Sequence, residues 1–145
     1  MKSLHCITLS VFCKEHCGEN KDLINQKLSD LSYLDLPSEK LSIDTEIADG
    51  LEEGSKINIF KLKLEKSKHA RAFLNNFLSR LDDSQINTLI DQIDSRLDEN
   101  CHFFIRIDKD KWYGDKIELT DSGNCFHINI SIAAYPAKKE GITSL

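Results

Sequence analysis

The chain has 145 residues, of which 40% are hydrophobic and 30% are charged. This length fits a single domain, residues 1–145, with a core large enough to fold without a metal or a disulfide. No apolar run approaches the roughly 18 residues of a membrane span, and the first residues do not resemble a secretory signal, so we expect a cytoplasmic protein. The five cysteines are odd in number and follow no disulfide-scaffold spacing, which indicates reduced thiols. A net charge of −5 argues against unspecific binding to polyanions, although basic and acidic residues are segregated along the chain.

The first third of the chain predicts a strand, a helix and a second strand. Residues 4–13 form a short apolar run with the alternation of a strand. Asn20 is suited to cap a helix that continues to about Ser32. Residues 41–47 alternate again, with a strongly acidic second face.

Residues 56–64 predict a third strand in which the alternation changes phase. Two apolar residues fall on one face and three on the other: Ile57 and Ile59 against Phe60, Leu62 and Leu64. A β-bulge near residues 59–60 explains this change, because a shift of one residue reverses every later side chain. The alternative is a strand that is buried on both faces at its centre.

The second half predicts two helices and then two strands. Apolar residues recur at helical spacing over 73–81 and over 86–97, and Asp82 with Gln85 forms a capping-box pattern before the second helix. Residues 101–108 and 126–134 alternate as strands, joined by a segment that begins as a polar, aromatic loop. The order β-α-β-β-α-α-β-β predicts an α+β fold, an antiparallel or mixed sheet of about five strands with helices packed on one face.

The last two predicted strands leave one face of the sheet open. This face is expected to carry Phe104, Arg106 and two histidines. RNA-binding sheets stack unpaired bases on exposed aromatic rings, with Arg and Lys nearby for phosphates. The alternative is that Phe104 packs under a loop or a partner and that Trp112 belongs to a satellite core. The basic run 61–71 could follow a phosphate backbone, or it is a solvated strand end and first helical turn.

Two clusters could carry metal or acid–base chemistry. The favoured interpretations are instead incidental or buried cysteines for one and a solvated turn for the other. Cys13, His16 and Cys17 lack the second ligand pair that structural zinc needs. Asp108 and Asp110 alternate with lysines, a pattern more typical of a solvated turn than of a Mg²⁺ site. We therefore expect no metal, no cofactor and no enzymatic activity.

Three motifs resemble one known family over nearly the whole chain. Ser10-Val-Phe12, followed by His16 and an acidic helix opening, is similar to the family's first strand–helix junction. Ile105-Arg-Ile-Asp-Lys109 resembles its Ile-Arg-Leu-Asp-Lys strand end. Ala133-Ala-Tyr-Pro136 with Lys138-Lys-Glu140 resembles its closing Ala-Ala-Tyr-Pro-Gly-Lys-Arg-Glu motif. The family comprises archaeal RNA-binding proteins described as a predicted exosome subunit.

Three positions depart from the family pattern. Ala137 replaces a Gly and Lys139 replaces an Arg, which keeps the charge but changes loop flexibility and bidentate phosphate geometry. Asp110 stands where a neutral polar residue is common, which makes that loop less attractive to phosphate.

The resemblance implies a fold like that of the ribosomal protein that binds 5S RNA, an archaeal cytosolic setting, and RNA processing or ribosome-related assembly. The RNA-contact candidates are Arg106, Lys109 and Lys111 for phosphates, Trp112 and Tyr135 for stacking, and, in second place, Lys138, Lys139, Lys66, Lys68 and Arg71. Expected partners are RNA and the exosome or other RNA-processing proteins, and a homodimer remains open. The alternatives are a protein-interaction subunit that docks through the exposed sheet face and, less favoured, a Mg²⁺-dependent nuclease.

Overall fold

The computed structural model describes residues 3–14, 20–49, 54, 56–92 and 102–133. The helices and strands of this part of the chain are β1 (Ser3–Lys14), α1 (Lys21–Ser32), β2 (Asp44–Asp49), β3 (Lys56–Leu64), α2 (Ser67–Ser79), α3 (Asp83–Asp91), β4 (His102–Asp108), α5 (Lys109–Tyr113) and β5 (Cys125–Ala133).

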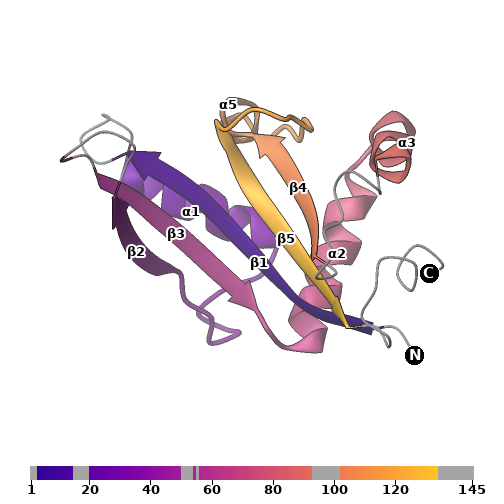
Figure 1. Ribbon diagram of the computed structural model, residues 1–145. Coiled ribbons are helices and arrows are strands. Elements are labelled where there is room, and N and C mark those ends of the chain that lie inside the picture. Colours follow the sequence, from indigo (N-terminus) through magenta and orange to yellow (C-terminus); the bar gives the residue numbers. More distant parts are fainter. Residues whose placement is uncertain (1–2, 15–19, 50–53, 55, 93–101, 134–145) are drawn as a thin grey trace.

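The strands form one five-stranded sheet in the order β2-β3-β1-β5-β4. Every neighbouring pair is antiparallel, and β1 lies at the centre between β3 and β5 (Figure 1). The α+β fold and the predicted order of strands and long helices are therefore confirmed.

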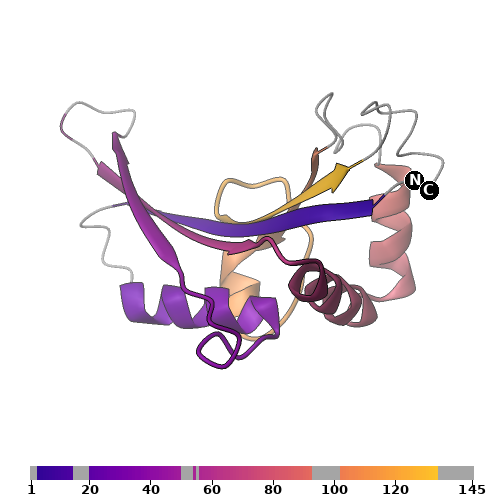
Figure 2. The ribbon, with the colours of Figure 1, turned by 90° about the horizontal axis from the view of Figure 1, so that it is seen from below.

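The helices α1, α2 and α5 lie on one side of the sheet, and α3 lies at one end of the molecule (Figure 2). Alternate residues of the strands, such as Leu9 of β1 and Ile128 of β5, are fully buried against this helix layer. The helices contribute residues such as Leu28 and Phe73 to the same core. Burying a side chain of this size contributes roughly 1.5–3 kcal/mol, so this face drives folding.

Local signals set the beginnings of two helices as predicted. The side chain of Asn20 accepts hydrogen bonds from the backbone N–H groups of Asp22 and Leu23 and so caps α1. Asp82 and Gln85 form the predicted capping box before α3.

The segment after β4 differs from its expected loop conformation, because residues 109–113 form the short helix α5. Asp108 begins this helix, since its carboxylate accepts the backbone N–H of Lys111 at 2.9 Å. The sequence interpretation missed this cap because Asp108 also ends the alternating strand pattern.

The bulge predicted near residues 59–60 is wrong. The ladders of β3 with β1 and with β2 run without interruption through this position. Phe60 and its alternate neighbours face the helices, whereas Ile57 and Ile59 are half-buried on the other face. The irregularity of the sheet lies instead in the β1–β5 ladder, between Leu4 and Cys6.

The second strand begins later than predicted, at Asp44 instead of Leu41. The backbone N–H of Leu41 is already used in a turn, where it donates to the carbonyl of Leu36 at 2.8 Å. Leu41 and Ile43 pack against the core from this connection, which explains the apolar alternation ahead of the strand.

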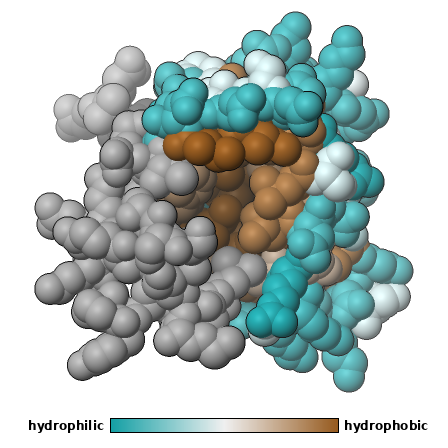
Figure 3. Space-filling view, turned by 90° about the vertical axis from the view of Figure 1, so that its right-hand side faces the viewer, coloured by the Kyte–Doolittle hydropathy of each residue, from teal (hydrophilic) through white to brown (hydrophobic). Residues whose placement is uncertain are grey.

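The end of the molecule where α3 lies is hollowed. Figure 3 looks onto this end and shows a hollow with a hydrophobic lining beside a hydrophilic rim. RNA contact requires cationic groups, so this lining is a poorer candidate for an RNA site than the uncovered sheet face. Within the described ranges, no helix is long and apolar enough to cross a membrane.

Candidate nucleic-acid interface

The face of the sheet opposite the helices carries polar, cationic and aromatic side chains in defined rows. One row crosses all five strands, because Asp44 pairs with Lys61, Lys61 with Ser10, Ser10 with His127 and His127 with Arg106. A second row joins Lys63, Thr8, Asn129 and Phe104 in the same way. We call this surface the open face and define it by the side chains of these two rows together with Phe12, Lys14, Glu46 and His102.

Two phenylalanines stand out on the open face, each beside a histidine. Phe12 is 44% exposed, and its ring centroid lies 4.9 Å from that of His127. Phe104 is 40% exposed and stacks on His102 with a centroid distance of 6.0 Å. A hydrogen bond of 2.9 Å between Nδ1 of His102 and the side-chain oxygen of Asn129 orients the second pair. The two pairs are preorganised aromatic surfaces that folding leaves partly exposed.

Cationic side chains flank these rings on the same face. Arg106 is exposed, and one of its terminal nitrogens donates to the carbonyl of Asp121 at 3.1 Å. A guanidinium has five N–H donors, so this bond positions the group and leaves other N–H donors for a ligand. Lys63 and Lys14 are exposed on β3 and β1.

The β2 edge of the open face has the opposite charge. Glu46 forms an ion pair of 3.1 Å with Lys61, and Asp44 lies opposite Lys61 in the ladder. Phosphate is repelled by carboxylates, so the cationic part of the open face comprises β4, β5, β1 and the Lys63 side of β3.

The pKa of His127 is lower than its ordinary value. Burial is the main cause, and the positive charges of Arg106 and Lys109 act in the same direction. His127 is therefore neutral at pH 7, and the positive charge of this row comes from Arg106. Burial raises the pKa of the Cys125 thiol, which lies 3.5 Å from Nε2 of His127.

Two predicted contact residues lie in the interior instead of on a surface. Trp112 is only 4% exposed, and its indole N–H donates to the carbonyl of Lys27 at 2.9 Å. Lys109 is 5% exposed, and its Nζ donates to the carbonyl of Phe12 at 2.9 Å. Neither side chain presents the surface that base stacking or phosphate contact needs, so the expected roles of both are corrected. The physical reason is α5, which turns both residues towards the core.

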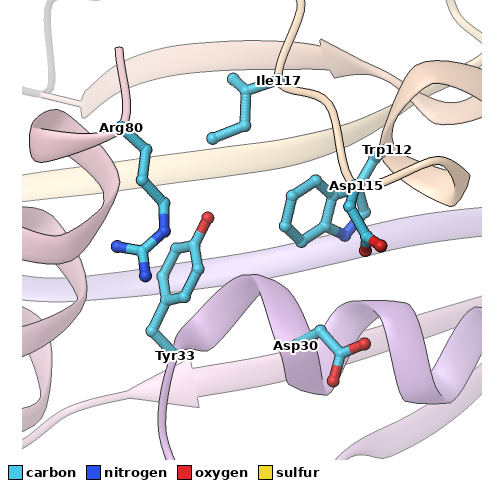
Figure 4. A pocket seen from close by; sticks show the side chains of 6 residues that line it. All are labelled: Asp30, Tyr33, Arg80, Trp112, Asp115 and Ile117. Carbon is cyan, nitrogen blue, oxygen red and sulfur yellow. The ribbon is translucent and has the colours of Figure 1, made fainter.

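Trp112 forms part of the wall of a cavity of about 470 Å³ on the helix side of the sheet, together with Asp30, Tyr33, Arg80, Asp115 and Ile117 (Figure 4). Cations already lie against both rings here: the Arg80 guanidinium is 4.0 Å from the Tyr33 ring centroid, and Lys27 Nζ is 4.5 Å from that of Trp112. Lys27 also forms an ion pair with Asp115. These ring faces are occupied, so the cavity offers a base less than the open face does.

The remaining predicted residues that the structure describes do not gather around Arg106. Lys111 is exposed on α5, with its Nζ 4.0 Å from a Glu118 oxygen. Lys66, Lys68 and Arg71 are exposed where α2 begins, beyond the end of β3, and Lys68 lies 3.4 Å from Glu39. Tyr135, Lys138 and Lys139 lie outside the described residues.

Phe12 is a residue of the open face that the sequence interpretation missed, whereas His127 was expected there as one of the two histidines but was not named as a contact residue. The alternation of β1 contained the signal, because Phe12 is out of phase with Ile7, Leu9 and Val11. What the sequence could not reveal is that β5 pairs with β1, which brings His127 against Phe12.

The acidic and thiol clusters show no metal-binding arrangement in the part of the chain that the structure describes. No group of three or more His, Cys, Asp or Glu residues is placed to hold a metal ion there. The Asp108 carboxylate caps α5, and Asp110 accepts a hydrogen bond from Asn124 at 3.2 Å. The Cys13 thiol donates to the carbonyl of Lys14 at 3.5 Å, while His16 and Cys17 lie outside the described residues.

Fold and surface together define a class of protein, an α+β domain whose sheet is covered by helices on one face and presents rings and cations on the other. A family model described as RNA binding matches residues 6–133. The chain belongs to this RNA-binding family. A curated relative, the RNA-binding protein PAB1135 of Pyrococcus abyssi, is 28% identical over 89 residues, which are 61% of this chain. The match spans 58% of the relative, less than two thirds of its length.

Solved structures of archaeal proteins share the fold. Protein AF2318 of Archaeoglobus fulgidus, described with the family DUF54, superposes with a TM-score of 0.84 at 24% identity, covering 98% of this chain and 96% of that one. The DUF54 protein Mth689 of Methanothermobacter thermautotrophicus has a TM-score of 0.74 at 23% identity, with 97% and 93% covered. At these identities the likeness establishes the fold alone.

Proposed function

We propose that the protein binds RNA through the open face. The observation that carries this proposal is the presence of two partly exposed phenylalanines and the exposed cations Arg106, Lys63 and Lys14 on the face of the sheet that none of the described helices covers. Aromatic rings and cations are the two components of sheet surfaces that bind unpaired nucleic acid. Membership of an RNA-binding family supports the same function.

Charge-reversal variants with fluorescence anisotropy over a range of salt concentrations test the location of the site. Removing one cation that neutralises a phosphate lowers the slope of log K against log salt by about 0.7–0.9. We expect Arg106→Glu and Lys63→Glu to weaken RNA binding and to reduce this slope.

Two variants on the helix side make the same change of net charge, one as a control and one as a test of the basic run. Lys21→Glu replaces an exposed lysine at the start of α1 and should leave the slope unchanged. Arg71→Glu tests the basic run at the start of α2. An equal reduction of the slope for all four variants would refute a site on the open face, and a reduction for Arg71→Glu alone would move the site to the basic run.

We further propose that the bound RNA is a substrate or component of an RNA-processing or ribosome-related assembly in an archaeal cytoplasm. The family resemblance supports this setting. The same resemblance implies that the exosome is a partner and that the fold is like that of the ribosomal protein that binds 5S RNA. Affinity capture from native archaeal extract, with and without ribonuclease, distinguishes partners held by RNA from direct partners. Light scattering of the purified protein tests for a homodimer.

The second candidate function is protein docking through the same face. It is favoured by the exposure of Phe12 and Phe104, because apolar side chains that a monomer leaves uncovered also mark protein interfaces. Loss of a captured protein partner on Phe104→Ala, together with the absence of RNA binding by the wild type, would favour docking over RNA binding.

A further inference from the structure

We infer that the RNA recognised by the open face is single-stranded, and that it is held at two separate base-stacking positions with a phosphate contact between them. This inference rests on the proposed function and specifies its substrate. The first stacking position is the pair Phe12 and His127, and the second is the pair Phe104 and His102.

The ladder registers determine how far apart the two positions are. Phe104 lies opposite Asn129, which lies opposite Thr8, so Phe12 is four residues further along β1. Four residues of strand and two strand spacings correspond to about 13 Å and about 10 Å, which places the two phenylalanines about 16 Å apart.

This separation excludes neighbouring bases of one continuous stack. The repeat along one strand of a stacked duplex is about 3.4 Å, far shorter than the distance between the two positions. Bases that lie on Phe12 and on Phe104 are therefore not stacked on each other, and a strand that reaches both rings has intervening nucleotides between them.

Arg106 lies opposite His127 of the first stacking position, on the side towards Phe104. Its row, through His127 and Ser10, lies between the row of Phe104 and the position of Phe12 on β1. The bond to the Asp121 carbonyl keeps the guanidinium in place at the β4 edge, next to the path of a strand that reaches both rings. Thr8 and Asn129 supply uncharged hydrogen-bonding groups on the same path.

A duplex does not fit this surface. Its bases are paired and stacked inside, so they cannot lie on Phe12 or Phe104, and A-form RNA is recognised through phosphates and 2′-hydroxyls. Recognition of that kind would need cations across the width of the sheet. The β2 side instead presents Asp44 and Glu46, with Glu46 paired to Lys61.

The test compares one RNA sequence of about 12 nucleotides, within the site sizes of single-strand binders, as a single strand and as a duplex with its complement. Anisotropy titrations at fixed salt give both affinities. We expect the duplex to bind at least tenfold more weakly. Phe12→Ala and Phe104→Ala should each weaken single-strand binding about tenfold, because a base-stacking contact contributes 1–3 kcal/mol.

Leu23→Ala is the matched control, since Leu23 is an apolar side chain of similar exposure, 43%, in the helix layer. It should leave both affinities unchanged. Thermal melting of every variant checks that the exposed substitutions leave the fold intact.

The outcomes separate this inference from the proposed function. Equal or tighter binding of the duplex, or single-strand binding that is unaffected by both phenylalanine variants, overturns the inference and leaves RNA binding standing. If neither form of the RNA binds to the wild-type protein, the proposed function itself fails.

Discussion

The two faces of the sheet differ although they are built from the same strands. On β1, Val11 is fully buried under the helices while its neighbour Phe12 is 44% exposed on the open face. On β4, Ile105 and Ile107 are buried while Phe104 and Arg106 are exposed. The covered face is predominantly apolar because burial of apolar surface drives folding, although the polar Asn58 of β3 is also buried on this side. The two phenylalanines of the open face stay 40–44% exposed, and this exposure is the reason why we propose a ligand for them.

The segment 109–112 shows the reverse case, in which residues that suit RNA contact are buried. Its Lys109 and Trp112 are residue types that suit RNA contact, yet both serve the folded core. Lys109 binds the carbonyl of Phe12 and so supports the strand that carries one of the exposed rings. Residue type alone therefore does not distinguish a ligand contact from a structural one.

The largest expected effect is on stability. It is measured by comparing two single variants, one aromatic residue replaced by alanine on the covered face and one on the open face. Phe126 is fully buried, so Phe126→Ala should lower the free energy of unfolding by about 3–5 kcal/mol. Phe104→Ala should lower it by less, because the ring is 40% exposed and an aromatic pair contributes only about 0.5–1.5 kcal/mol beyond its buried area. Urea denaturation measures both, and equal losses would mean that Phe104 belongs to the core.

Lys109→Met should have an intermediate effect on stability and none on the salt dependence of RNA binding. The substitution leaves the Phe12 carbonyl without the bond from Nζ, at a cost of about 1–3 kcal/mol. Denaturation and salt titrations measure the two quantities. A reduced salt slope with unchanged stability would instead identify Lys109 as a phosphate ligand.

Acid should weaken the fold by a smaller amount through His127. Burial and the nearby charges of Arg106 and Lys109 lower the pKa of this imidazole in the folded state. The unfolded chain, whose histidine titrates near about 6.5, therefore takes up the proton first. The contribution of His127 to stability is present above pH 6.5 and is lost as the pH falls through the folded pKa.

Proton NMR titration measures the pKa of His127 directly, and His127→Phe should remove its part of the pH dependence. A folded-state pKa above 6.5 would contradict the prediction. Bound RNA should raise the pKa, because phosphates near Arg106 stabilise the imidazolium.

The smallest expected effect is on the fluorescence of the single Trp. Trp112 is buried on the helix side, so RNA on the open face should leave its emission nearly unchanged. A titration that follows anisotropy and intrinsic fluorescence together checks this. Strong quenching in step with binding would mean that RNA reaches Trp112.

Much of the fold could be predicted because its signals are local. Asn20 and the pair Asp82–Gln85 mark helix starts, since capping groups lie within three residues of the N–H groups that they satisfy. The phase change in β3 was misinterpreted because apolar Ile57 and Ile59 on the open face resemble a shift of register.

The candidate site was only partly predictable. Arg106 and Phe104 could be assigned to an open face from alternation within β4 alone. Their relation to Phe12 could not, because it depends on β5 pairing with both β1 and β4.

By itself, the sequence determined the order of the strands and long helices, the caps of α1 and α3 and, outside β3, the side of each strand on which a residue lies, since these depend on periodicity and on neighbours in the chain. Only the tertiary structure decided which strands are adjacent, that α5 buries Lys109 and Trp112, and that two aromatic pairs share a face with Arg106. The physical reason is that strand pairing and core packing join residues far apart in the chain, and many pairings satisfy the same local alternation.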